Sequence, residues 1–327
     1  MPYKADRLKN LRRIFYRLKI ISVLPILYGL AVFTSAYAYA APEQQSITIV
    51  YQHTRGFSQQ LISHLENDLK HNNIIVRTIQ LSDFKKSLDP QETNLILAIG
   101  SQTTKTLLDN NTTSPILSLL IPKSFSDALE KTHPDTTNWS CLLIDQPINR
   151  HFQLISEIFG AEYKAGILLG PLTQSSEGKF SSAANATGNK ISTRYIESPE
   201  QLSPALKSLS KETNVLLASP DQSIYNRSTT RGILLDSYRY KLPIIGFSKA
   251  YVKAGAIAAI YSKPEQISFQ ATQLSKRFLL NHTLDNKKYY PDDFSVSLNH
   301  KVARSMGIRL PEISTLTKQI KRSEQQP

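Results

Sequence analysis

The stretch LILAIGSQTT, Leu95 to Thr104, indicates the fold class of this chain. The apolar run Leu95 to Ile99 has the length and composition of a buried strand, and Gly100 allows the tight turn that follows it. Ser101 is a residue typical of a helix start, and the pattern over residues 101–110 predicts that helix. A strand followed directly by a helix is the repeating unit of a parallel α/β sheet.

The same unit recurs on both sides of this stretch. In a first series, short apolar runs predict strands at 47–51, 74–79, 116–121 and 141–144, with an amphipathic helix from residue 57 to 69. A second series predicts strands at 165–169, 191–196, 215–218 and 243–247. Its helices are expected at 150–159, 176–187, 199–211 and 225–240.

Two series of similar length predict an α/β fold with two doubly wound parallel-sheet lobes. Further elements at 256–262, 266–280 and 294–306 fit if the chain recrosses between the lobes, which makes the crossings a hinge. We therefore expect a first lobe of residues 41–147 and 250–283, and a second lobe of residues 148–249 and 284–327.

The first 40 residues have the pattern of a secretory signal peptide. Seven Lys or Arg lie within residues 1–20, an apolar run follows, and Ala38-Tyr39-Ala40 provides a cleavage site before Ala41. The alternative is an uncleaved membrane anchor, because the apolar run is just long enough to span a bilayer. No Cys follows the run, so a lipoprotein anchor is not expected. The sequence thus predicts a periplasmic protein.

Charge and cysteine content argue against several classes of function. The formal net charge of +13 includes seven cations and one anion from residues 1–20, so the rest of the chain carries about +7. The densest basic segment, Lys318 to Arg322, is interpreted as a solvated terminus, and no nucleic-acid partner is expected. Cys141 is the single cysteine and is expected to pack as a small apolar residue. The scattered His residues predict no metal site.

Polar residues directly after predicted strands are the candidate ligand contacts, because ligands of open α/β sheets bind at the carboxyl ends of the strands. Ser101 and Thr103 offer hydroxyl groups beside a helix N-terminus, although Ser101 is equally explained as a helix cap. Asp221, in the stretch Ser219 to Gln222, offers a carboxylate for a ligand ammonium or hydroxyl group. It too is equally explained as a cap.

Asp145, Gln146, Pro147 and Arg150 lie at the presumed first crossing between the lobes. Arg150 is suited to bind a ligand carboxylate. We favour the alternative in which it pairs with Asp145 and stabilises the hinge.

Motifs for catalysis are absent: the chain contains no Gly-x-Ser-x-Gly, no phosphate-binding Gly-x-x-x-x-Gly-Lys-Ser/Thr and no His-Glu-x-x-His. No nucleophile–base pair is evident, so a hydrolase is the less favoured hypothesis, and no cofactor is expected. A purely structural or assembly role is a third hypothesis.

Three C-terminal motifs resemble a known family. They are Pro243 to Ser248, Tyr251 to Ala256, and Phe294 to Asn299 followed by Val302 to Ile308 and Pro311. In order and spacing they are similar to the periplasmic solute-binding proteins of ABC transporters, in particular the group of tryptophan and tyrosine binders. Residues 119–123, Leu-Leu-Ile-Pro-Lys, are more apolar than in transporter-linked members.

The resemblance implies a type I periplasmic-binding fold with three crossings and a small organic ligand, such as an amino acid, held between the lobes. It implies ligand contacts from Ser101 and Gln102 on the first lobe, Asp221 on the second and Ser248 near a crossing; Thr103 and Gln222 adjoin these positions. It implies an inner-membrane permease as partner, or alternatively a membrane sensor that responds to the ligand-bound protein.

Overall fold

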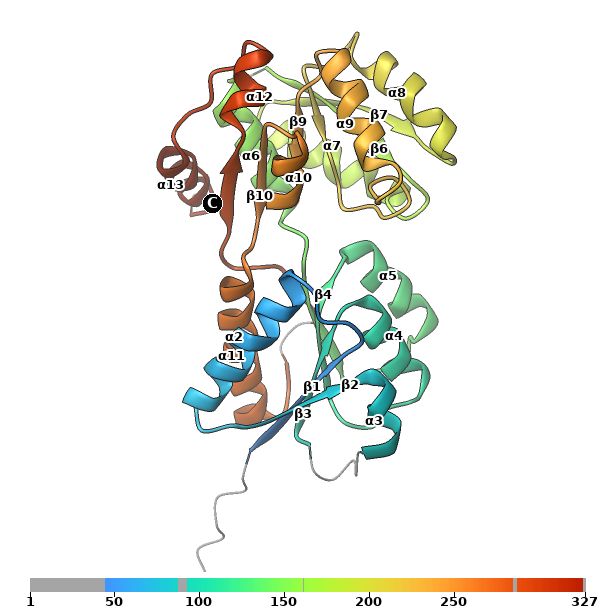
Figure 1. Ribbon diagram of the computed structural model, residues 1–327, viewed down its shortest axis with the longest axis vertical. Helices are drawn as coiled ribbons and strands as arrows, with labels where there is room; N and C mark the ends of the chain where they lie inside the picture. Colours follow the sequence, from blue (N-terminus) through green and yellow to red (C-terminus); the bar gives the residue numbers. More distant parts are fainter. Residues whose placement is uncertain (1–44, 88–92, 161, 285–286, 326–327) are drawn as a thin grey trace, which may run out of the picture. The chain divides into compact units, whose positions relative to one another are not determined.

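A computed structural model describes residues 45–325, apart from 88–92, 161 and 285–286. The predicted signal peptide, residues 1–40, lies outside the described residues. Within them the chain forms two six-stranded, mostly parallel sheets with helices between the strands (Figure 1). The prediction of an α/β fold with two doubly wound lobes is therefore confirmed.

The first sheet has the order β11-β5-β4-β3-β1-β2, and its pairs are all parallel. Its strands are β1 (Ser46–Tyr51), β2 (Ile75–Gln80), β3 (Leu95–Ile99), β4 (Ile116–Ile121), β5 (Trp139–Leu143) and β11 (Lys288–Tyr289). Its helices are α2 (Phe57–His71), α3 (Leu81–Ser87), α4 (Ser101–Asp109), α5 (Lys123–Thr132) and α11 (Pro264–Asn281).

The second sheet has the order β12-β10-β9-β8-β6-β7, with only the β10–β12 pair antiparallel. Its strands are β6 (Lys164–Leu169), β7 (Lys190–Tyr195), β8 (Val215–Leu217), β9 (Ile244–Gly246), β10 (Ala258–Tyr261) and β12 (Ser295–Leu298). Its helices are α6 (Ile148–Phe159), α7 (Glu177–Ala186), α8 (Leu202–Leu209), α9 (Thr230–Arg239), α10 (Lys249–Ala254), α12 (His300–Ser305) and α13 (Ile313–Ser323).

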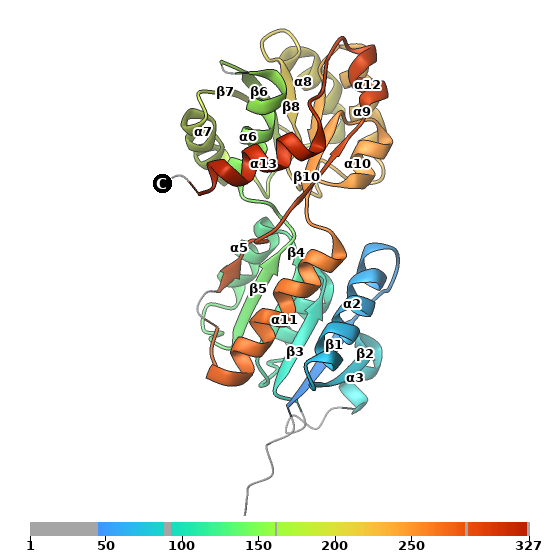
Figure 2. The same cartoon turned by 90° about the vertical axis from the view of Figure 1, so that its left-hand side faces the viewer.

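Strand β3 shows why a central strand of the first sheet is apolar throughout. Leu95, Leu97 and Ile99 pack in the cluster formed with α2 and α11, whereas Ile96 and Ala98 pack in the cluster formed with α4 and α5. Side chains alternate along a strand, so a sheet covered by helices on both faces needs apolar residues at every position. Figures 1 and 2 show α2 and α11 on one face of this sheet and α4 and α5 on the other.

The crossings between the sheets differ from the boundaries expected from the sequence. β10 pairs with β9 in the second sheet, although residues 250–283 were expected in the first lobe. The chain passes to α11 only after Tyr261, and β11 pairs with β5 of the first sheet, although residues from 284 onward were expected in the second lobe. The two-residue strand β11 is too short to be recognised from an apolar run.

The C-terminal segment is a helix rather than the solvated terminus expected from its Lys and Arg residues. In α13, Leu316 and Ile320 are fully buried in the core cluster of the second sheet, whereas Lys318, Lys321 and Arg322 are exposed. Apolar residues four positions apart produce this buried face. Cys141 is a buried free cysteine, as predicted. Across the described part of the chain, no helix is both long enough and apolar enough to cross a membrane.

Candidate functional site

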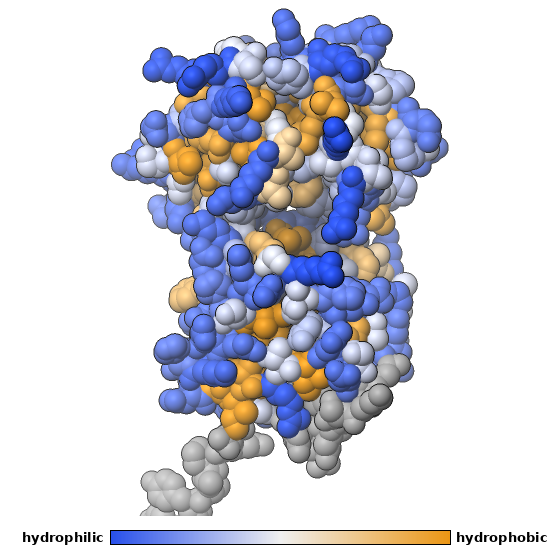
Figure 3. All heavy atoms as spheres, viewed as in Figure 1, coloured by the Kyte–Doolittle hydropathy of each residue, from blue (hydrophilic) through white to orange (hydrophobic). Residues whose placement is uncertain are grey.

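A cavity of about 350 Å³ opens at the carboxyl ends of strands from both sheets. The segments that line it follow β4, β5, β6, β8 and β9, where backbone N–H groups and loop side chains are free to meet a ligand. Most of its wall is apolar or aromatic, and Figure 3 shows hydrophobic side chains in a hollow bordered by strongly hydrophilic ones. The volume and character fit a small organic molecule.

Leu120 forms part of the apolar wall from an unusual backbone conformation. Its φ is 61°, and the register between β4 and β5 shifts between Leu119 and Ile121, so Leu120 lies in a β-bulge. A left-handed conformation in a bulky residue costs about 1–2 kcal/mol. Bulges of this kind redirect a side chain, and here the redirected residue lines the cavity.

Three buried polar atoms that have no hydrogen-bond partner among the described residues belong to side chains lining this cavity. They are Nδ1 of His151, Oγ of Ser219 and the hydroxyl of Tyr225. Their side chains are 6%, 5% and 7% exposed. An unpaired buried polar atom costs about 1–3 kcal/mol. Burial, together with the neighbouring Arg150, lowers the pKa of His151 to about 4, so its imidazole is neutral at pH 7.

The charged side chains that line the cavity already have partners. Lys123 pairs with Asp127 at 2.5 Å, and Asp127 also pairs with Lys288. Asp145 accepts a hydrogen bond from the backbone N–H of Lys123 at 2.7 Å, which caps α5. These pairs hold the first-lobe side of the cavity in place.

Asp221 connects two turns at the base of the second lobe. One carboxylate oxygen accepts from Oγ1 of Thr173 at 2.7 Å, and the other accepts from the backbone N–H of Ser223 at 2.9 Å and from its hydroxyl at 2.5 Å. Asp221 is 1% exposed. A Cβ on Gly170 would lie 2.3 Å from Oγ of Ser223, so only glycine fits beside this carboxylate. Its bonds indicate a structural role in addition to the predicted ligand contact.

Of the six residues predicted as ligand contacts, three lie together in the lining of the cavity. Asp221, Gln222 and Ser248 all line the cavity. Ser101, Gln102 and Thr103 do not; they form the first turn of α4, where the hydroxyl of Thr103 is buried without a partner. The backbone N–H of Gly100 donates to Leu119 O at 2.8 Å, which places this turn beside the bulged Leu120.

The side chain of Arg150 links the first crossing between the sheets, residues 144–147, to the third, residues 290–294. Nη1 donates to Oε1 of Gln146 and to Pro291 O, both at 2.8 Å, and Nη2 donates to Asp292 O at 2.9 Å. Its guanidinium pairs with Glu324 just beyond α13 and lies 4.9 Å from the centre of the Phe294 ring. The hinge-stabilising role was predicted, but the predicted partner, Asp145, was wrong because its carboxylate caps α5 instead.

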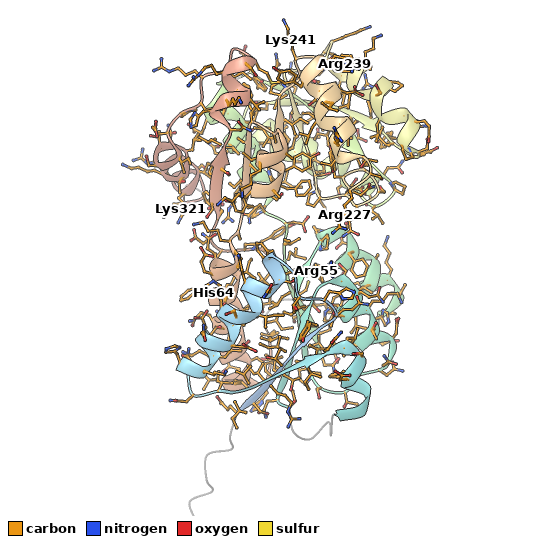
Figure 4. All side chains as sticks on the ribbon, viewed as in Figure 1. Arg55, His64, Arg227, Arg239, Lys241 and Lys321 are labelled. Carbon is orange, nitrogen blue, oxygen red and sulfur yellow. The ribbon has the colours of Figure 1, made fainter. Side chains whose placement is uncertain are left out.

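The second crossing, residues 262–263, is hydrogen-bonded to both of the others. Nε2 of Gln146 donates to Oγ of Ser262 at 2.8 Å, and Ser262 donates to Asp293 O at 2.6 Å. Lys321 of α13, labelled in Figure 4, pairs with Asp293 at 2.8 Å. Pro147, predicted as a hinge residue, directly precedes α6. All three crossings are thus linked by hydrogen bonds, so a movement at one must rearrange the others.

Replacing Asp145 by Asn is expected to change how stability depends on pH. Burial raises the pKa of Asp145 to about 6, so its contribution to stability is complete below about pH 4 and is lost as the pH rises through 6. Asn stays neutral and still accepts from the Lys123 N–H. We expect Asp145→Asn to gain about 1–3 kcal/mol over wild type between pH 4.5 and 7.5 in urea unfolding. Parallel pH profiles for the two proteins would contradict this.

Sequence reasoning missed His151, Tyr225 and the partners of Arg150. His151 was hidden within an amphipathic helix, and the bonds of Arg150 reach residues distant in sequence. Ser219 and His151 do not form a nucleophile–base pair, since neither Oγ nor Nδ1 has a partner among the described residues. Residues 45–325, where described, contain no cluster of three or more His, Cys, Asp or Glu suited to a metal ion.

The chain matches the model of one known protein family. The model of the family described as ABC transporter substrate binding protein matches residues 80–321. The chain therefore belongs to the ABC transporter substrate-binding protein family. No curated protein matches the chain by sequence.

Solved structures with a similar fold cover most of the chain. One is an ABC domain from Streptococcus pneumoniae in complex with L-Trp, with a TM-score of 0.60, 14% identity, and coverage of 85% of this chain and 98% of that one. A conserved domain protein from Vibrio cholerae has a TM-score of 0.59 at 17% identity, with 84% and 98% coverage. The open substrate-binding protein CD0873 from Clostridium difficile has a TM-score of 0.63 at 15% identity, with 82% and 96% coverage.

Proposed function

We propose that this protein is exported, captures a small organic solute in the cavity and presents it to an inner-membrane permease. The observation that carries the proposal is the cavity itself, which is mostly apolar and opens at the carboxyl ends of strands from both sheets. Asp221, Gln222 and Ser248 are proposed to support the ligand from the second lobe. Membership of the ABC transporter substrate-binding family supports the permease as partner.

Through the hydrogen-bonded crossings, a solute bound in the cavity can influence how the two lobes are arranged. A ligand that contacts both lobes favours one hinge arrangement, and a membrane partner that recognises this arrangement responds to the ligand. Ser101, Gln102 and Thr103 lie outside the cavity lining, so we propose that they approach the ligand only when the lobes close. The same physical mechanism serves a membrane sensor, which is the second candidate partner.

A bound solute is expected to raise the melting temperature of the protein without being consumed. A ligand at 100 times its Kd stabilises the native state by about 2.7 kcal/mol, which corresponds to a shift of several degrees. A thermal-shift screen of amino acids, their derivatives and small aromatic compounds tests this, followed by mass spectrometry of the recovered compound. Chemical conversion of the compound would instead support the hydrolase hypothesis.

A further inference from the structure

A second hollow, a groove of about 770 Å³, runs between α9 and α10 on the second lobe. From the side of α9 it is lined by Arg231, Leu235 and Tyr238, which follow one another at intervals of four and three residues and therefore share one side of the helix. From the side of α10 it is lined by Ala250 and Ala254. These small side chains leave the space in front of α9 unfilled.

The groove is lined mostly by apolar groups, and some of them are exposed. Leu235 and Tyr238 are 57% and 51% exposed, whereas Leu234 and Tyr251, which also line the groove, are buried. Figure 3 shows apolar surface over this part of the second lobe with strongly hydrophilic side chains around it. An apolar hollow with exposed large apolar side chains is typical of an interaction site.

The charges around the groove are almost all positive. Residues 226–255, which include α9 and α10, contain six Lys or Arg, all exposed, and one acidic residue, Asp236, which pairs with Arg239. The six cations, three of them labelled in Figure 4, are Arg227, Arg231, Arg239, Lys241, Lys249 and Lys253. The neighbouring α12 adds Lys301 and Arg304 and no acidic residue. This face of the second lobe therefore attracts an acidic partner.

Two of these cations, Arg227 and Arg231, line the groove itself and have no acidic partner among the described residues. A guanidinium group binds a carboxylate through two parallel hydrogen bonds, so both side chains are suited to acidic residues of a partner. Two copies of this chain do not fit together through this face, because the same cations would oppose one another. A bilayer offers a flat surface, whereas a recess between two helices accepts side chains from a polypeptide segment.

The groove and the solute cavity share part of their walls. Tyr225 and Phe247 line both, and their ring centres lie 6.0 Å apart. Tyr251 completes the aromatic cluster, with its ring centre 5.2 Å from that of Phe247. A segment that occupies the groove therefore packs against residues that also line the solute cavity.

We propose that the groove between α9 and α10 is the docking site for an acidic, apolar segment of a partner protein. The apolar side chains of the segment fill the groove, and its carboxylates pair with Arg227 and Arg231. The inference goes beyond solute capture. Only the expectation that the segment belongs to the permease or to the sensor rests on the proposed function.

Photo-crosslinking of the full chain in its native cells tests the inference. The crosslinker p-benzoylphenylalanine replaces Tyr238, or, as the control, Tyr195 of β7, which is 47% exposed and does not line the groove. We expect the Tyr238 position, but not the Tyr195 position, to crosslink to a protein. Mass spectrometry should locate the link in a segment that combines apolar residues with an excess of Asp and Glu. A linked lipid, a second copy of this chain, a segment without excess acid, or no link above the control overturns the inference.

Further variants separate the charge of the groove from its shape. Arg227→Gln combined with Arg231→Gln is expected to lower the crosslinking yield at position 238 about three- to tenfold, because each exposed ion pair contributes modestly to binding. Ala250→Trp puts a large ring into the groove, leaves every cation in place and should lower the yield as well. An unchanged yield in either of these proteins contradicts the proposed docking site.

A matched control tests whether net charge alone attracts the partner. Lys207→Gln combined with Lys211→Gln removes two exposed cations from the same lobe outside the groove, and it should leave the yield unchanged. A loss equal to that of the Arg227 and Arg231 variant would overturn the inference. Melting temperatures of all these proteins should match that of wild type, because the substituted side chains are exposed.

These outcomes are distinct from those that test solute capture. A solute that raises the melting temperature of the wild-type protein, with no crosslink at position 238, removes only the docking groove. A crosslink that depends on Arg227 and Arg231, with no solute bound in the thermal-shift screen, removes only solute capture. Failure of both measurements contradicts both proposals.

Discussion

Arg150→Met is expected to lower the free energy of unfolding by about 3–5 kcal/mol, which is a large part of the stability of a typical domain. Arg150 is 6% exposed, and its loss leaves Glu324, the Gln146 amide and the carbonyls of Pro291 and Asp292 without their donor. Urea unfolding followed by circular dichroism measures the change. Because the three crossings share this network, the hinge is also expected to loosen.

Arg150→Lys provides a second variant if the Met variant does not fold. Lysine keeps the charge but cannot reproduce the several donors of a planar guanidinium, so we expect an intermediate loss of about 1.5–3 kcal/mol. Arg304→Met on α12 is the matched control, since Arg304 is exposed, and it should stay within about 0.5 kcal/mol of wild type. A loss below about 1 kcal/mol for both Arg150 variants would show that the crossings do not depend on this side chain.

Asp221→Asn is expected to lower the free energy of unfolding by about 2–3 kcal/mol, since an amide NH2 must then face the hydroxyl of Thr173 or the N–H of Ser223. The affinity for a bound solute should fall as well, because the displaced turn carries Ser219 and leads to Tyr225. Asp236→Asn, which removes only a surface pair with Arg239, is the control, with an expected change below about 0.5 kcal/mol.

The two measurements on Asp221→Asn separate its roles. Lowered stability and weakened binding together indicate that the carboxylate positions the second-lobe turns. Weakened binding at unchanged stability would instead make Asp221 a direct ligand contact, as the sequence alone had suggested.

The fold was predictable from local patterns because central strands such as β3 and β5 are buried on both faces and the longer helices are buried on one. The run Leu95 to Ile99, followed by Gly100 and Ser101, therefore indicates a strand, a turn and the start of a helix within a few residues. The places where the chain changes sheets were not predictable to the same degree. β10 and β11 are short, and nothing local to either strand shows which of the two sheets it joins.

The site was predictable only where polar residues follow a strand directly. Asp221 and Ser248 were identified in this way. His151 lines the cavity from the first turn of α6, and no local sequence pattern indicates that role. Whether a polar atom has a partner depends on residues distant in sequence. The partners of Asp221 and the lack of partners for Tyr225 therefore emerge only when the turns are brought together in three dimensions.

Native mass spectrometry of the protein isolated from the periplasm tests the central proposal, capture of a small organic solute in this cavity. We expect a noncovalent adduct of a small molecule that is absent after denaturation. Ser124→Trp, which adds a large side chain to the cavity wall, should abolish the adduct, whereas Ser82→Trp on the exposed side of α3 should retain it. An adduct that survives in Ser124→Trp, or no adduct in the wild-type protein, would contradict the proposal.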